Sequence, residues 1–344
     1  MENGKQIEQA ICQLGFACEC VKGVVSPRFE IYYFKLDNPI QINDFGTKQI
    51  KILEQVFSTR LFFDKTLVEY AFSIGFEHKS FVLPHQYFGW SQDNKQEHVN
   101  IGVDILNNNV SLDFWNNINH ILIGGATGSG KSTLMNSMIT DMIGRGCVSD
   151  KPYIFLFDPK KVEFAKFKDI PFVHYECETY LISQKLNWLV KAMEQRYKEF
   201  TEKGFTDYKQ ANYQPYYVFV DELADLMMCG DPMIEQSIIR LAQKGRGAGI
   251  HLILATQNPI AKVCTSLIKS NMTTRIALKC ATKMQSIVLL DHIGAEKLLG
   301  KGDALLKLPN KVDEIRFQCS YSSDDFIHEW LNGTKNTCRK YGLL

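Results

Sequence analysis

A glycine-rich segment near the middle of the chain carries the clearest chemistry in the sequence. It reads Gly125-Ala-Thr-Gly-Ser-Gly-Lys-Ser132, follows an apolar run at residues 121–123 and opens a helical pattern. Glycines at these spacings let backbone N–H groups turn inward around phosphate oxygens, and the start of the following helix adds partial positive charge. In this pattern Lys131 reaches the β- and γ-phosphates, while the Ser132 hydroxyl binds Mg²⁺. The segment therefore predicts a nucleotide site with a magnesium ion.

The alternative for this segment is a chance glycine-rich turn, and the strand before it and the helix after it argue against that alternative. The expected nucleotide-binding residues are Gly125, Ala126, Thr127, Gly128, Ser129, Gly130, Lys131, Ser132 and Thr133.

Two carboxylates follow a second apolar strand further along the chain. In Tyr217-Val-Phe-Val-Asp-Glu222 the strand ends at the acidic pair. Asp221 at such a position can bind Mg²⁺, and Glu222 can polarise the water that attacks the terminal phosphate. A buried strand followed by a capped turn would look the same by itself, and the glycine-rich segment favours the catalytic interpretation. Glu222 then predicts hydrolysis in addition to binding.

Two further polar residues are candidates for the same site. The apolar strand His251–Thr256 ends at Gln257, whose amide can sense the γ-phosphate, with a surface turn as the alternative. Arg246 lies in the glycine-flanked segment Lys244-Gly-Arg-Gly-Ala-Gly249. Its guanidinium could act as an arginine finger in the site of a neighbouring subunit. Spacing alone explains Arg246 better as a solvated side chain at the end of a helix.

Short apolar runs alternate with helical patterns from residue 118 onwards. The runs are almost continuously hydrophobic, as expected for strands whose sheet is covered on both faces. This alternation predicts an α/β fold with a mostly parallel sheet. One helix has clear end signals, because Asp231 can cap its start, Pro232 suits its first turn and glycines from Gly245 onwards can end it. The expected strands are Ile121–Gly125, Tyr153–Asp158, Tyr217–Asp221, His251–Thr256, Arg275–Cys280 and Ala304–Leu308, and the expected helices are Ser132–Ile143, Gln184–Lys203 and Pro232–Lys244.

The first hundred residues have a different character. The run from Gly23 to Leu36 is rich in aromatic and β-branched residues and predicts a strand. Apolar residues recur at three- and four-residue spacing between Asp44 and Phe57 and predict a helix. We therefore expect a small α+β domain at residues 1–110 and a nucleotide-binding domain at residues 111–344.

Composition restricts the class of protein and its compartment. The net charge is +1, so any contact with nucleic acid must come from a local cluster of cations. No apolar signal core and no run of about 20 apolar residues is present, which predicts no membrane segment. Ten cysteines are scattered without a CxxC pair, as expected in the cytoplasm. The basic C-terminal tail, with Lys335, Arg339 and Lys340, is expected to fray.

Several longer segments resemble the motor of the FtsK/SpoIIIE family of DNA translocases. The stretch Arg240-Leu-Ala-Gln-Lys-Gly-Arg-Gly-Ala-Gly-Ile-His-Leu-Ile-Leu-Ala-Thr-Gln257 is far more specific for the family than a phosphate-binding loop alone. Further matching segments occur in the family's order, and together they cover most of the chain. They are His120–Ser132, Phe157-Asp-Pro-Lys160, Met193–Lys198, Val218–Met228 and Gly294–Asp303.

The resemblance implies a RecA-like P-loop NTPase core that hydrolyses ATP with Mg²⁺. It also implies a homo-oligomeric ring, expected to be a hexamer, with double-stranded DNA as the partner in its channel. Loops between Gln257 and Lys283 would contact the DNA backbone, and Lys269 and Lys283 match family positions that do so. Such contacts are independent of DNA sequence and weaken with salt. The catalytic set that the resemblance implies is Lys131, Asp221, Glu222, Gln257 and, acting in the neighbouring subunit, Arg246.

This sequence departs from the family at two positions where arginine is common, since it has Asn258 and Ile287 there. Fewer cations would therefore line the channel. Two alternative functions stay open: a related protein-secretion ATPase, which a weakly cationic channel permits, and a nucleotide-gated scaffold without transport, against which Glu222 argues. Among translocases, the short chain suggests a motor for transfer, packaging or segregation of the DNA of a mobile element or chromosome.

Overall fold

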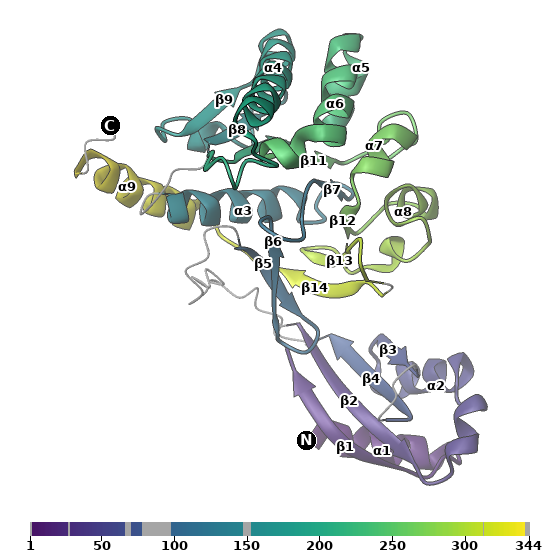
Figure 1. Cartoon of the computed structure of the whole chain (residues 1–344). Coiled ribbons are helices and arrows are strands. Elements are labelled where there is room, and N and C mark those ends of the chain that lie inside the picture. The colour runs from purple at the N-terminus through teal and green to yellow at the C-terminus, as the bar shows by residue number, and fades with distance from the viewer. Residues whose placement is uncertain are drawn as a thin grey trace. The chain divides into compact units, whose positions relative to one another are not determined.

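A computed structural model describes the chain at residues 2–26, 28–65, 70–77, 98–146, 153–311 and 313–340 (Figure 1). The chain divides into two units, one formed by residues 1–84 with 103–108 and the other by residues 85–102 with 109–344. The predicted domain boundary at residue 110 stays a prediction.

The smaller unit combines an antiparallel sheet with two α-helices, as expected for an α+β fold. Its core contains stacked aromatic rings, with the centroids of Phe45 and Phe72 4.6 Å apart. The sheet has the order β1-β2-β4-β3. Its elements are α1 (Glu2–Gln13), β1 (Cys18–Val25), β2 (Phe29–Leu36), the 3-10 helix η1 (Pro39–Asn43), α2 (Thr47–Phe57), β3 (Leu61–Asp64) and β4 (Phe72–Glu77).

The prediction of one strand from Gly23 to Leu36 was wrong, because the chain reverses within it. The backbone N–H of Ser26 donates to the carbonyl of Phe29 at 2.8 Å, and the Ser26 hydroxyl accepts from the N–H of Phe29 at 3.0 Å. A serine hydroxyl thus closes the turn between β1 and β2.

The larger unit is built on a ten-stranded sheet with the order β6-β5-β14-β13-β12-β7-β11-β10-β8-β9. The six strands from β12 to β9 in this order run parallel, and β13 is antiparallel to both of its neighbours, β12 and β14. All six predicted strands and the mostly parallel α/β fold are confirmed. The strands are β5 (His98–Asp104), β6 (Asn109–Asp113), β7 (Ile121–Gly124), β8 (Tyr153–Phe157), β9 (Val173–Glu176), β10 (Tyr216–Val220), β11 (Ile250–Thr256), β12 (Thr274–Leu278), β13 (Asp303–Lys307) and β14 (Ile315–Cys319).

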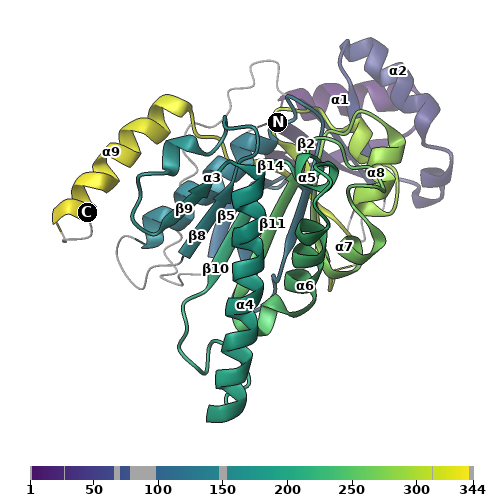
Figure 2. The same cartoon turned by 90° about the horizontal axis from the view of Figure 1, so that it is seen from above.

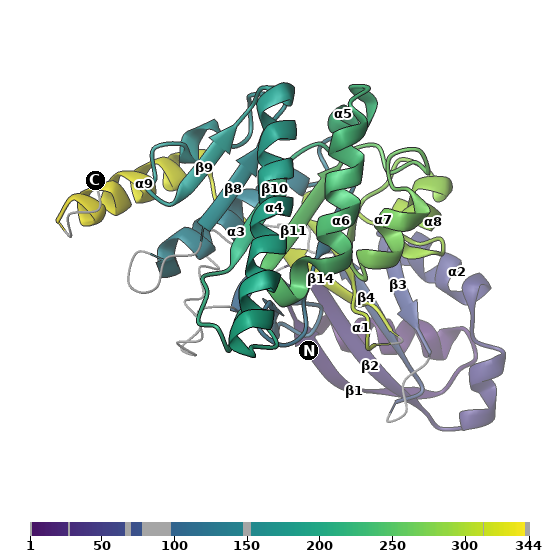
Figure 3. The same cartoon turned by 45° about the horizontal axis from the view of Figure 1, so that its top comes forward.

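Side chains alternate between two apolar cores, one on each face of this sheet. On β10, Tyr217 and Phe219 belong to the first core, and Val218 and Val220 belong to the second. Because both faces are covered at the centre of the sheet, β7, β8, β10 and β11 are hydrophobic at almost every position. Figures 2 and 3 show α4 and α6 side by side over the second face. The first core contains α3 (Lys131–Gly146) and α9 (Asp324–Lys340), and the second contains α4 (Thr179–Lys203), α5 (Leu223–Met228), α6 (Pro232–Ala248), α7 (Ser266–Asn271) and α8 (Lys283–Leu290).

Helix α6 begins as predicted and ends later than predicted. The Asp231 side chain accepts a hydrogen bond from the N–H of Met233 at 2.9 Å, so it caps the helix. The helix continues through Gly245, where an added Cβ would lie 2.7 Å from the carbonyl oxygen of Ile250. That glycine therefore permits close packing of the helix on β11. The helix ends at Gly249, whose φ of 72° is the left-handed conformation of a C-cap.

The expectation of a frayed C-terminal tail was wrong. Residues 324–340 form α9, which buries Ile327 and Leu331 in the first core. Lys335 also makes an ion pair with Asp169 at 2.8 Å. None of the helices in the described ranges has the length and hydrophobicity that a membrane crossing requires.

Two histidines are buried near the amino ends of β7 and β11. His120 Nδ1 accepts from the N–H of Leu252 at 3.1 Å, and His251 Nδ1 lies 2.9 Å from the carbonyl oxygen of Asn119. Burial disfavours the charged ring and lowers the pKa of His120 to about 3 and that of His251 to about 4. Both rings are therefore neutral in the folded protein near pH 7.

We predict that the free energy of unfolding decreases as the pH falls below about 6.5, the usual pKa of histidine. The unfolded chain binds protons there that the folded chain cannot, so the stability present above that pKa is lost at about 1.4 kcal/mol per histidine per pH unit until the folded pKa is reached. Urea unfolding at about pH 7.5 and about pH 5.5 measures the loss. His251→Phe should reduce the loss by roughly 1.4 kcal/mol. An equal loss in the variant and the wild type would contradict the prediction.

Candidate functional site

The glycine-rich loop joins β7 to α3, and neighbouring strands hold its shape. The N–H of Gly125 donates to the carbonyl of Thr256 at 3.3 Å, and the N–H of Ala126 donates to that of Lys279 at 2.8 Å. Gly130 has a φ of 104°, and an added Cβ there would lie 2.6 Å from the backbone nitrogen of Gly302. A side chain at this position would therefore push the loop away from the turn that precedes β13.

The centre of the loop presents unpaired donors where α3 begins. Within the described part of the chain, the backbone N–H groups of Thr127, Gly128 and Gly130 have no hydrogen-bond acceptor. Ser132 and Thr133 lie half-buried in the first helical turn, whose N–H groups have no partner within the helix. Converging N–H groups at a helix N-terminus bind anions such as phosphate. The nine predicted residues thus form one strand–loop–helix junction.

Lys131 makes an ion pair with the carboxylate that was predicted to bind magnesium. Its Nζ lies 2.8 Å from Asp221 Oδ1 and 2.7 Å from the main-chain oxygen of Asp221. Asp221 Oδ2 is buried and has no hydrogen-bond partner among the described residues. A buried carboxylate oxygen without a donor is unfavourable unless a cation occupies its free side. Asp221 and the Ser132 hydroxyl are hard oxygen donors, so the residues present fit Mg²⁺.

Glu222 is the most heavily hydrogen-bonded side chain of the candidate site, and it is 2% exposed. Its Oε1 accepts from Thr256 Oγ1 at 2.7 Å and, more weakly, from the N–H of Ala224 at 3.4 Å. The N–H of Gln257 lies 3.2 Å from both oxygens. Oε2 also accepts from Lys160 Nζ at 3.0 Å. The carboxylate is therefore held by Lys160 after β8, by residues at the end of β11 and by the first turn of α5, the helix that Glu222 caps.

Gln257 connects this carboxylate to the glycine-rich loop. The Thr127 hydroxyl donates to Gln257 Oε1 at 2.9 Å, while the Gln257 N–H donates to Glu222. The carboxyl ends of β7, β10 and β11 are neighbours in the sheet. The structure thus brings Lys131, Asp221, Glu222 and Gln257 together at one edge.

Comparison with known proteins agrees with this geometry. The family model described as FtsK/SpoIIIE family matches residues 88–217 and 206–261. The chain belongs to the FtsK/SpoIIIE family. The DNA translocase FtsK of Leptospira interrogans is 39% identical over 258 residues, which are 70% of this chain and 27% of that relative. The DNA translocase SftA of Bacillus subtilis is 40% identical over 237 residues, which are 65% of this chain and 25% of that relative. The chain thus spans about a quarter of the length of these two relatives.

A solved structure shares the fold over almost the whole chain. It is the pCW3 conjugation coupling protein TcpA in its monomer form with ATPγS, with a TM-score of 0.66 and 24% sequence identity. The match covers 96% of this chain and 99% of TcpA.

Arg246 does not join the site in this FtsK/SpoIIIE family member. It lies exposed in the last turn of α6, before β11, whereas Gln257 follows the other end of β11. A strand of this length spans roughly 20 Å, beyond the reach of an arginine side chain. Within the described residues, the guanidinium has no hydrogen-bond or ion-pair partner.

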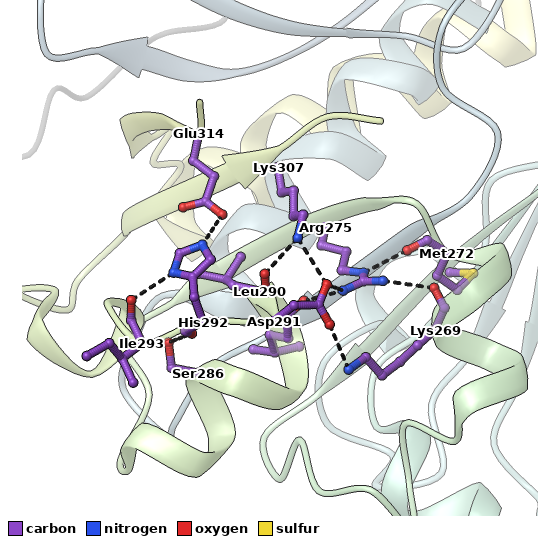
Figure 4. Close-up of polar contacts among 11 residues, drawn as sticks. Lys269, Met272, Arg275, Ser286, Leu290, Asp291, His292, Ile293, Lys307 and Glu314 are labelled. Carbon is purple, nitrogen blue, oxygen red and sulfur yellow. Dashed lines mark hydrogen bonds and ion pairs between the residues drawn. The ribbon is translucent and has the colours of Figure 1, made fainter. Parts of the chain in front are cut away.

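Lys269 belongs to an ion cluster around Asp291 (Figure 4). Its Nζ lies 3.1 Å from Asp291 Oδ1, and Asp291 Oδ2 lies 2.7 Å from Arg275 Nη1 and 3.0 Å from Lys307 Nζ. Partial burial would raise the pKa of Asp291, but the hydrogen bonds of Lys307 and Lys269 and the charge of Arg275 lower it well below its usual value. Asp291 therefore stays ionised and paired.

Arg275 extends this cluster to the helix ends. It donates to the carbonyls of Lys269 and Met272, at the end of α7, and to that of Leu289 in α8. Lys283, by contrast, is exposed at the first residue of α8, and its side chain has no partner among the described residues. The structure thus gives the two candidate DNA-binding lysines different surroundings.

The sequence did not predict the partners that hold these groups. Lys160 was noted only as part of a family segment, and Thr256 only as a strand residue. Lys160 lies two residues after the predicted strand Tyr153–Asp158, and this cation near a strand end was the available signal. The signal could point to Glu222 only with the knowledge that β8 and β10 are adjacent.

Proposed function

We propose that this chain is the motor of an ATP-driven translocase of double-stranded DNA. The observation that carries the proposal is the path from Thr127 through Gln257 to Glu222, which joins the phosphate-binding loop to the catalytic carboxylate. Gln257 also begins the segment that leads to Lys283. Membership of the family and the names of two relatives as DNA translocases support DNA as the substrate.

The proposed reaction uses the chain's own residues in defined roles. The N–H groups of the loop bind the phosphates of ATP, and Lys131 leaves Asp221 to contact the β- and γ-phosphates. Asp221 and Ser132 would hold Mg²⁺, which would neutralise charge on the phosphates. Glu222 accepts a proton from the attacking water, and Gln257 senses whether the γ-phosphate is present.

We further propose that the active assembly is a ring, expected to be a hexamer, in the cytoplasm. Arg246 supports this proposal, because it is exposed, unpaired among the described residues and too far from the loop of its own subunit. In a ring, the same guanidinium can approach the nucleotide of the next subunit and stabilise the charge of the transition state.

Of the two lysines, Lys283 has the stronger support as a DNA contact. Its ammonium group is exposed, whereas that of Lys269 is 23% exposed and paired with Asp291. We propose that Lys283 contacts DNA phosphate directly and that Lys269 mainly supports the end of α7.

The translocation proposal predicts that the chain displaces a triplex-forming strand from linear duplex DNA when ATP is present. Lys131→Ala should abolish displacement because it removes phosphate binding. Glu222→Gln should bind ATP and yet fail to displace, because it loses the base. A triplex-displacement assay at low salt measures all three proteins, and no displacement by the wild type would refute translocation.

The ring proposal predicts that Arg246→Ala retains ATP binding but lowers DNA-stimulated kcat by about 10³-fold or more. Arg240→Ala is a matched control on the same helix, because Arg240 pairs with Glu194 at 2.8 Å on the surface. It should change kcat by less than about twofold. Steady-state ATPase assays and nucleotide titrations separate the two effects. Equal losses in both variants would contradict a role for Arg246 in the neighbouring site.

The DNA-contact proposal predicts that Lys283→Ala reduces the slope of log affinity against log salt concentration by about 1. Lys269→Ala should leave this slope unchanged, because its charge is already paired with Asp291. Fluorescence anisotropy with labelled duplex DNA at several salt concentrations measures the slope. A change with Lys269→Ala and none with Lys283→Ala would reverse the assignment.

A further inference from the structure

Lys160 lies directly beside the proposed general base. It follows β8, which is paired with β10, the strand that ends at Asp221. Its Nζ lies 3.0 Å from Glu222 Oε2, and its side chain is 36% exposed while that of Glu222 is 3% exposed. Burial would lower the pKa of Lys160, but the hydrogen bond and charge of Glu222 raise it, so the ammonium group stays charged. The partly exposed side chain of Lys160 thus contacts the buried carboxylate of Glu222.

The hydrogen bonds that Glu222 already accepts leave its carboxylate no acceptor position for a water molecule. A carboxylate offers about four acceptor positions, two on each oxygen. Thr256, Ala224 and Gln257 donate to Oε1, and Lys160 and Gln257 donate to Oε2. A general base must accept a hydrogen bond from the water that it activates. One of these donors therefore has to leave before Glu222 can act.

The donors differ in how easily they can leave. Two are backbone N–H groups, of Ala224 in α5 and of Gln257 directly after β11, and the third is the hydroxyl of Thr256, which is 0% exposed. Lys160 is the donor with a long flexible side chain that reaches solvent. Its departure frees a position on Oε2 and leaves the other three donors in place.

We propose that Lys160 is a positioning residue that restrains Glu222, occupying the lone pair on Oε2 that the attacking water requires until ATP draws the ammonium group away. The negative charge of the γ-phosphate competes with Glu222 for the lysine. The inference rests on the proposed ATPase function and adds a residue that controls when hydrolysis begins.

Lys160→Met tests the restraint, because it keeps the length of the side chain and removes the charge. Its kcat for ATP hydrolysis without DNA should rise roughly 3- to 10-fold, with KM for ATP changed by less than about twofold. Lys160→Arg keeps the charge and should resemble the wild type in both measurements.

Two control experiments show whether the added hydrolysis uses Glu222 and whether each variant is folded. The double variant Lys160→Met, Glu222→Gln should be inactive, which shows that the added hydrolysis uses Glu222. Thermal melting of each variant identifies any loss of folding, and Lys160→Arg then provides the folded comparison.

A DNA-free kcat for Lys160→Met at or below the wild-type value, or an equal rise in kcat for Lys160→Arg, would overturn the restraint while leaving the ATPase function intact. Absence of hydrolysis by every variant and by the wild type, with and without DNA, would instead refute the proposed function together with the restraint.

Discussion

Two adjacent carboxylates at the end of β10 each hold a lysine, and the candidate site depends on these two ion pairs. Asp221 pairs with Lys131 from the phosphate-binding loop, and Glu222 pairs with Lys160 from the neighbouring strand end. Asp221 is fully buried, and a buried charge that loses its partner destabilises the protein by about 3–5 kcal/mol. In this structure Lys131 is the cation beside Asp221. In the proposed reaction, Mg²⁺ would take the place of Lys131 as nucleotide enters, so that Asp221 would keep a cationic partner.

The parallel sheet brings the strand ends that carry these groups together. Parallel strands place their carboxyl ends at one edge, so residues from β7, β8, β10 and β11 meet there although they are distant in the chain. The hydroxyl of Thr256 and the N–H of Gln257 then hold Glu222 from the next strand. The candidate catalytic groups are thus joined by hydrogen bonds across adjacent strands.

Much of the parallel sheet could be predicted from the sequence, because strands covered on both faces are hydrophobic throughout. The missed strands lack this signal: β6 alternates exposed and buried residues, and the short edge strand β9 reads Val-His-Tyr-Glu. The turn at Ser26 was missed although the sequence carries a turn signal there, Ser26-Pro27, because the aromatic and β-branched residues on both sides suggested one continuous strand. The positions of Asp221, Glu222 and Gln257 at strand ends followed from the pattern. The pairing of Lys160 with Glu222 did not, since it depends on a strand order that differs from the order along the chain.

The ion cluster at Asp291 has a mechanical consequence for α7 and α8. Arg275 and Lys307 tie the C-terminal ends of both helices to β12 and β13. The opposite end of α8 faces the nucleotide edge, where the Gln285 side chain accepts from the N–H of Ala281, and the carbonyl of Lys279 accepts from the phosphate-binding loop. A helix that is held at one end can tilt but cannot move along its own axis. Displacements that begin at the loop would therefore reach α8 at its N-terminal end, where Lys283 lies, while Arg275 and Lys307 hold its C-terminal end in place.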